Sequence, residues 1–140
     1  MLSIEKKFAT DLEASKDGVW HRIDEETQIK VAKARNENFK KRAYELFNEN
    51  KIEMFSRTGK FTDLDESKLM SQLIAETILL DWKGVKDQDG KEVKYTPEIG
   101  AQVLANPEMG DFLELVQTCA ENEEAYRKAV LEKVEEQAKK

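Results

Sequence analysis

The chain has 140 residues, of which 39% are hydrophobic and 37% are charged, and its formal net charge is −6. This length predicts a single domain, residues 1–140, with one modest core, and the regular spacing of apolar residues excludes global disorder. The acidic balance disfavours nucleic acid as a partner, and the longest apolar run, residues 78–80, is far too short to cross a membrane.

The N-terminal third predicts an arm followed by a β-hairpin. Residues 1–16 have weak periodicity, so we expect a flexible arm there. Residues 18–34 contain two alternating runs, GVWHRI and TQIKVAKA, joined by the polar link DEET, and this pattern is typical of a hairpin. The alternation places Trp20 and His21 on opposite faces. A lone hairpin is marginal in water, so its apolar face must pack on helices or on a partner.

Apolar residues then recur at helical spacing, and we predict helices over residues 36–50, 63–82, 97–105 and 107–136. Asn36 is a predicted N-cap, and Thr96 followed by Pro97 is a strong helix start. Residues 51–62 are interpreted as a linker or loop. The Asp-Gly pair in residues 84–95 predicts a second small hairpin or an extended loop. The expected fold class is therefore α+β, mainly α-helical.

The sequence offers few residues that could perform chemistry. His21 is the only histidine, so no zinc site of familiar spacing can form, and Cys119 lies on an apolar stripe and is expected to pack in the core. DQDGKE, residues 87–92, fails as a calcium loop because its glycine is misplaced and a proline follows inside the loop. We therefore expect no enzyme activity, no catalytic residue, no metal and no cofactor.

A basic cluster runs from Lys30 to Arg42 in this otherwise acidic chain. Such a cluster can mark a surface that binds nucleic acid. The alternative is that it forms the solvated side of a strand and a helix. We favour the solvated side because the overall charge is negative.

Three segments, in this order, resemble the tail assembly chaperones of long-tailed (siphovirus-like) bacteriophages. The first is GVWHRIDEETQIKVAKARNENF, residues 18–39, and the second is ETILLDWKGVKDQDGKEVKYTPE, residues 76–98. The third is the helix pair from Pro97 onward, ending near AENEEAYR, residues 120–127. The resemblance covers roughly residues 6–127, and the second segment is the most distinctive of the three.

The resemblance implies a protein that acts by binding. Members of the family are similar to holdases that keep the tape measure protein soluble and recruit subunits of the major tail tube protein. It implies work in the host cell cytoplasm, absence from the mature virion, and no contact with nucleic acid or membrane, and it leaves homo-oligomer formation open. The alternative hypothesis is a structural virion protein or head–tail connector that stays in the particle.

A protein of this kind needs apolar surface that can meet an apolar partner, together with net charge for solubility. The candidate partner-binding residues in the sequence are Trp20, Met54, Phe55, Phe61, Trp82 and Tyr95. For each residue the competing interpretation is packing in the core. We also expect Trp82 to anchor the chain reversal between the flanking helices.

Overall fold

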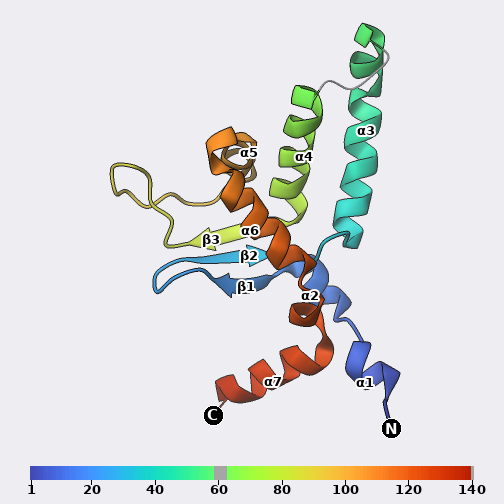
Figure 1. Ribbon diagram of the computed structural model, residues 1–140, viewed down its shortest axis with the longest axis vertical. Coiled ribbons are helices and arrows are strands. Elements are labelled where there is room, and N and C mark those ends of the chain that lie inside the picture. The colour runs from blue at the N-terminus through green and yellow to red at the C-terminus, as the bar shows by residue number, and fades with distance from the viewer. Residues whose placement is uncertain (59–62, 140) are drawn as a thin grey trace.

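A computed structural model describes the backbone of residues 1–58 and 63–139 and the side chains of residues 1–49 and 66–133. The protein is α+β and mainly α-helical, as predicted, with one three-stranded antiparallel sheet. Figure 1 shows helices α3 (Glu37–Thr58) and α4 (Asp63–Thr77) standing side by side above the sheet. Both chain termini lie at the opposite end of the molecule (Figure 1).

The predicted hairpin forms the first two strands of the sheet. Strand β1 (Val19–Arg22) pairs with β2 (Gln28–Val31), so that His21 lies opposite Ile29. Asp24 closes the turn, since its carboxylate accepts hydrogen bonds from the backbone N–H groups of Glu26 and Thr27. These two bonds hold the pKa of the Asp24 carboxyl below its ordinary value.

The prediction of one helix over residues 63–82 is wrong at its C-terminal end, where the chain forms a third strand. Helix α4 ends at Thr77, and β3 (Leu79–Lys83) pairs with β2. A short apolar run fits a strand and a helix equally well, so periodicity could not decide here. The strand is favoured because a two-stranded hairpin is marginal, and β3 satisfies the second edge of β2 while burying Leu79 and Trp82.

The core lies between one face of this sheet and three helices: α4, α5 (Pro97–Ala105) and α6 (Gly110–Glu121). Its buried members are Ile29, Val31, Ile74, Ala75, Ile78, Leu79, Trp82, Leu104, Val116 and Ala120. The predicted start of α5 is confirmed, because the Thr96 hydroxyl accepts the Ile99 N–H and Pro97 takes the first turn. The Asn36 cap of α3 is confirmed in the same way by the Phe39 N–H.

Helix α3 is longer than predicted. It continues past residue 50 to Thr58, so the expected linker is wrong for residues 51–58, and residues 59–62 lie outside the described part of the chain. The extension has a simple cause, since the sequence from Glu37 to Thr58 contains neither glycine nor proline.

The predicted helix over residues 107–136 is divided into four pieces. The 3-10 turn η1 (Pro107–Met109) precedes α6, and a second turn, η2 (Glu123–Tyr126), separates α6 from α7 (Lys128–Lys139). The second break places Tyr126 in the interior at 0% exposure, where its hydroxyl donates a 2.8 Å hydrogen bond to the Val31 carbonyl oxygen. Burial of this ring explains why the helix does not continue.

Residues 1–16 also differ from the expected arm. They form α1 (Ile4–Phe8) and most of α2 (Leu12–Asp17), whose N-caps are Ser3 and Asp11. The segment is tied to the C-terminal part of the chain by two backbone bonds, Asp11 N–H to the Tyr126 oxygen and Lys128 N–H to the Ala9 oxygen. The sequence pattern could not reveal these bonds, because they join main-chain atoms far apart in the chain.

The small hairpin predicted within residues 84–95 is present. Lys86 and Glu92 form an isolated antiparallel bridge, and the Val93 N–H donates to the Val85 carbonyl oxygen. Gly90 takes a positive φ of 81° at the turn, as the Asp-Gly signal predicted. This hairpin returns the chain from β3 to the start of α5.

Candidate interaction surface

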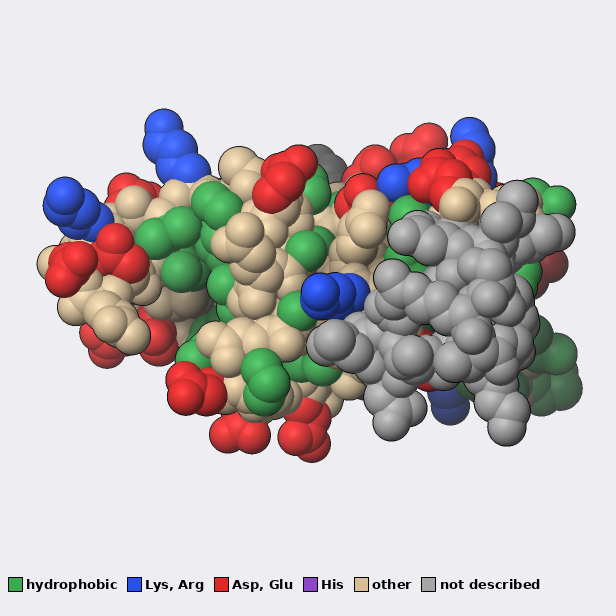
Figure 2. All heavy atoms as spheres, turned by 90° about the horizontal axis from the view of Figure 1, so that it is seen from above, with side chains coloured by type: hydrophobic (Ala, Val, Ile, Leu, Met, Phe, Trp, Pro, Cys, Tyr) green, Lys and Arg blue, Asp and Glu red, His purple; other side chains and the backbone are tan. Residues whose placement is uncertain are grey.

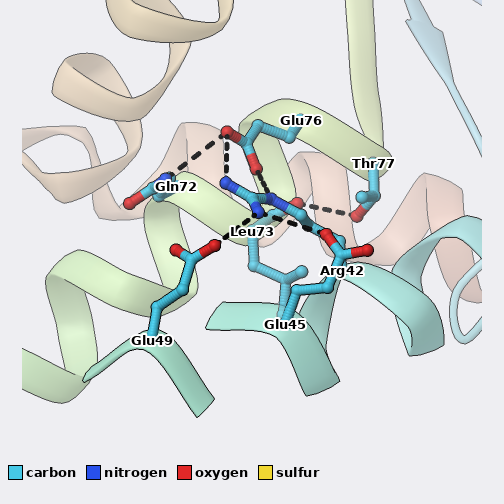
Figure 3. A network of polar contacts seen from close by, with 7 residues as sticks. All are labelled: Arg42, Glu45, Glu49, Gln72, Leu73, Glu76 and Thr77. Carbon is cyan, nitrogen blue, oxygen red and sulfur yellow. Dashed lines mark hydrogen bonds and ion pairs between the residues drawn. The ribbon is translucent and has the colours of Figure 1, made fainter. Parts of the chain in front are cut away.

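Helices α3 and α4 are joined by a polar network centred on Arg42 (Figure 3). Its Nε donates a 2.7 Å hydrogen bond to Glu76 across the two helices, and its Nη1 lies 3.3 Å from Glu45 and 3.6 Å from Glu49. Gln72 also donates to Glu76. The hydrogen bond from Arg42 is the main reason that the pKa of Glu76 is lowered. The network fixes one side of the helix pair.

An apolar depression follows α4, one part of it between α3, α4 and α6 and the other between α3 and α4. One part, of about 150 Å³, is lined mainly by Ala34, Phe39, Met70, Ile74, Ile78 and Ala120, and a second, of about 190 Å³, by Ala43, Leu46, Phe47, Leu69, Met70 and Leu73. Met70 lines both parts, and we call the combined depression the α4 groove. Each part has room for apolar side chains of a partner.

Polar groups lie around the α4 groove. Arg35, Gln117 and Glu121 line the first part together with its apolar residues, and Glu66 lines the second. Met70 is 43% exposed at the centre. An apolar floor with a charged rim is the arrangement in which amphipathic helices dock.

The face that includes the ends of α3 and α4 is shown in Figure 2. Acidic side chains recur along its margins, and hydrophobic ones are interspersed among polar and backbone atoms (Figure 2). This distribution combines charge, which favours solubility, with small areas of apolar contact.

The structure places Trp82, one of the predicted partner-binding residues, in the core. Its exposed fraction is 6%, and its indole N–H donates a 2.7 Å hydrogen bond to the Val93 carbonyl oxygen. The ring packs edge-on against Tyr95 and Phe112, with centroid distances of 4.9 and 6.4 Å. In this conformation the Trp82 ring is not available to a partner.

Tyr95 is partly buried beside Trp82. Its hydroxyl lies 2.5 Å from the carbonyl oxygens of both Ala75 and Leu79, at the point where α4 gives way to β3. Burial raises the pKa of the Tyr95 hydroxyl, so the phenol stays protonated and can donate. The side chain therefore fixes the helix-to-strand junction.

Trp20 lies on the other face of the sheet, away from the core. It is half-buried, it stands opposite Lys30 on β2, and the Lys83 ammonium lies 4.2 Å from the centre of its ring. The Lys83 ammonium covers one part of the ring by this cation–π contact, and another part of the ring stays on the surface. Contact between Trp20 and a partner stays a prediction.

The remaining candidates are not placed as side chains. The backbone of Met54 and Phe55 forms part of α3, but their side chains lie outside the described part of the structure. Phe61 lies wholly outside it. The proposed contact surface in this segment thus stays a prediction.

The two reactive side chains considered in the sequence both lie near Tyr126, whose ring is 6.4 Å from the His21 ring and whose hydroxyl is 3.5 Å from the Cys119 carbonyl oxygen. His21 has a buried Nε2 without a hydrogen-bond partner among the described residues, and desolvation lowers its pKa. Cys119 packs against the core, and burial raises the pKa of its thiol. Within the described residues, no group of three or more His, Cys, Asp or Glu side chains could hold a metal ion. No helix in that part of the chain has the length and apolarity needed to span a membrane.

The α4 groove was not identified from the sequence as an interaction surface. The available signal was the breadth of the apolar stripe on α4, where Leu69, Met70, Leu73, Ile74 and Ile78 occupy more than one side of a helix. A stripe this broad exceeds what a single packing contact buries. The sequence shows the stripe but not which part of it stays exposed, because that depends on the elements that pack against each face.

No curated protein and no solved structure matches the chain significantly. A family model does match, over residues 23–138, and it describes the YdaY prophage protein. This match includes strands β2 and β3, the core helices and the α4 groove, and it begins just after β1. The chain therefore belongs to the YdaY prophage protein family and is phage-derived.

Proposed function

We propose that this protein is a phage tail assembly chaperone that binds the tape measure protein, keeps it soluble and recruits tail tube subunits. The observation that carries the proposal is the α4 groove, whose two apolar parts meet at Met70. Membership of a prophage family supports a role in phage morphogenesis. The sequence resemblance to tail assembly chaperones supplies the partner.

The groove suits a helical partner that exposes apolar side chains. Such a helix presents side chains at intervals of three and four residues along one face, and a groove between helices can accept them. The second part contacts α4 from Glu66 to Leu73, and the first runs from Met70 to Ile78, just past the end of α4. The two parts therefore overlap at Met70 and follow one another along the helix. A partner helix lying along α4 would place one apolar residue in each part.

The charge of the molecule suits the same role. A formal net charge of −6 keeps a complex with an apolar protein in solution by mutual repulsion between complexes. The proposed activity is binding without a chemical step, in the host cytoplasm, with release before the virion is complete. Neither nucleic acid nor membrane takes part in it, and self-association is compatible with it.

Co-expression with the tape measure protein of the same phage tests the proposal. We expect the wild-type chain to raise the soluble fraction of that protein and Met70→Glu to remove most of the effect, because the new carboxylate would be desolvated in an apolar contact. Gln102→Glu adds the same charge at an exposed position on α5 and serves as the matched control. If the wild-type chain leaves the soluble fraction unchanged, the proposal fails.

The alternative, a structural protein or head–tail connector, predicts a different location. Mass spectrometry of purified virions separates the two, since a chaperone that leaves the tail is missing from the particle. Detection of the chain at a stoichiometry comparable with tail proteins would favour the alternative.

A further inference from the structure

The structure gathers much of the basic cluster noted in the sequence around one cleft. A hollow of about 290 Å³ lies between α2, the connector that follows β2, and the start of α3. Four cations line it, Lys16, Lys33, Arg35 and Lys40, against one carboxylate, that of Glu37. We call it the basic cleft. In a chain of net charge −6, this is a local reversal of sign.

Most of these cations have no counter-ion among the side chains that the structure describes. Lys16 lies 3.6 Å from Glu37, but no carboxylate among the described residues lies within 4.0 Å of the Lys33, Arg35 or Lys40 side chains. Arg42, by contrast, belongs to the same basic cluster in the sequence and is engaged by three glutamates. The basic cluster therefore has two parts. Arg42 forms ion pairs within the fold, whereas Lys33, Arg35 and Lys40 line the cleft.

The backbone of the cleft is fixed on three sides. The successive N–H groups of Ala32, Lys33 and Ala34 donate to the carbonyl oxygens of Ile78, Ser15 and Ala120, which belong to the α4–β3 junction, α2 and α6. Arg35 follows with a positive φ of 60°, an uncommon conformation for a residue other than glycine. Because the backbone of this connector is already held in place, binding costs little backbone conformational entropy.

From this geometry we propose that the basic cleft binds an acidic segment of a protein partner, with two or more carboxylates close together in sequence. Charge complementarity identifies the ligand class, and Leu12 and Ala34 add apolar contact for the stem of a glutamate. None of the described residues that line the cleft is aromatic, although sites for single-stranded nucleic acid commonly stack bases on aromatic rings. The proposal is independent of binding to the tape measure protein, because the cleft and the α4 groove have different linings except for Ala34 and Arg35.

Fluorescence anisotropy with a fluorescein-labelled peptide of repeated Glu-Ala tests the proposal, and a Gln-Ala peptide serves as the neutral control. We expect the wild-type protein to bind the acidic peptide in preference to the neutral one, and added salt to weaken the complex. The double variant Lys33→Gln, Lys40→Gln should bind it about fivefold to tenfold more weakly, because each exposed ion pair contributes modestly.

Lys91→Gln with Lys94→Gln changes the net charge equally at two exposed positions in the 84–95 hairpin, and it should leave the affinity within about twofold of wild type. Thermal unfolding of both double variants verifies that they fold. Equal loss of affinity in the two double variants, or no preference of the wild type for the acidic peptide, would overturn the proposal. Displacement of the peptide by a single-stranded oligonucleotide that binds more tightly would overturn it in favour of a nucleic-acid site.

Discussion

The indole nitrogen of Trp82 donates a 2.7 Å hydrogen bond to the carbonyl oxygen of Val93, and so joins β3 to the returning side of the 84–95 hairpin. The same ring packs on Tyr95, which reaches the end of α4. Trp82 and Tyr95 together thus connect the edge strand, the hairpin and the helix junction. The expected anchoring of the chain reversal by Trp82 agrees with this geometry.

Replacing Trp82 by alanine should lower the free energy of unfolding by about 3–5 kcal/mol, because it leaves a cavity beside Tyr95 and Phe112. Urea denaturation gives the value. Trp82→Phe retains much of the packing but leaves the Val93 carbonyl without its donor, so its cost should be smaller. Trp20→Ala is the control, since that ring is half-exposed and contacts Lys83 on the outer face. Equal costs for the two alanine variants would contradict the assignment of Trp82 to the core.

Two glycines with similar backbone angles should respond differently to alanine. Gly84 has a φ of 73°, and a Cβ there would overlap the carbonyl oxygen of Glu26 in the neighbouring hairpin turn. Gly90 has a φ of 81° but open space around the Cβ position. Gly90→Ala should therefore cost only the backbone strain, about 1–2 kcal/mol, whereas Gly84→Ala should cost clearly more. Urea midpoints of the two variants measure the difference, and a smaller loss for Gly84→Ala would contradict the close packing of the two turns.

Much of the fold could be predicted because the signals were local. The Asn36 and Thr96 caps, the Asp-Gly turn and the alternation in residues 18–34 each act within a few residues. The errors came where distant contacts decide the structure. Leu79–Lys83 becomes a strand because β2 has a free edge, and the long C-terminal helix breaks so that Tyr126 can reach Val31.

The interaction surfaces were harder to predict than the fold. The sequence does not tell whether the side chain of a tryptophan or a methionine is buried or exposed. Only the packing in the structure shows that Trp82 is buried and Met70 is exposed. The basic cluster was interpreted as a solvated face, and the position of α2 beside the connector could not be foreseen. Ser15 of α2 accepts the Lys33 N–H, and this bond between distant segments forms one wall of the basic cleft.

The Arg42–Glu76 pair should contribute measurably to the packing of α3 on α4. Both side chains are 28% exposed, so solvent screening limits the expected coupling energy to about 0.5–1 kcal/mol. A double-mutant cycle with Arg42→Gln and Glu76→Gln measures this coupling energy. A parallel cycle with Glu45→Gln should give a smaller coupling energy because that contact is longer and more exposed.

The contribution of Glu76 to stability should depend on pH. The pKa of Glu76 is lowered in the folded state, so this contribution is present above the ordinary carboxyl pKa and is lost as the pH falls through the lowered value. No coupling at neutral pH would contradict a stabilising role.

His21 should make the stability of the protein depend on pH in the mildly acidic range. Desolvation lowers its pKa in the folded protein, so between the lowered pKa and the ordinary value of 6.5 the unfolded chain binds more protons than the folded one. Stability must then fall as the pH decreases from about 7.5 to about 5.5, because protonation favours the unfolded state. The buried Nε2 strengthens this expectation, since it finds no hydrogen-bond partner among the described residues that could stabilise the cation.

Urea midpoints at these two pH values measure the effect, and His21→Leu provides the comparison. Leucine removes the only histidine in the chain and suits the interior face that His21 shares with Ile29 and Tyr126. The variant should lose most of the pH dependence, while the wild type should be less stable at the lower pH. Because the lowered carboxyl pKa values of Asp24 and Glu76 lie below this range, their titration does not obscure the comparison. If both proteins show the same slope, burial of His21 does not penalise its charged form, and the expected lowering of its pKa is wrong.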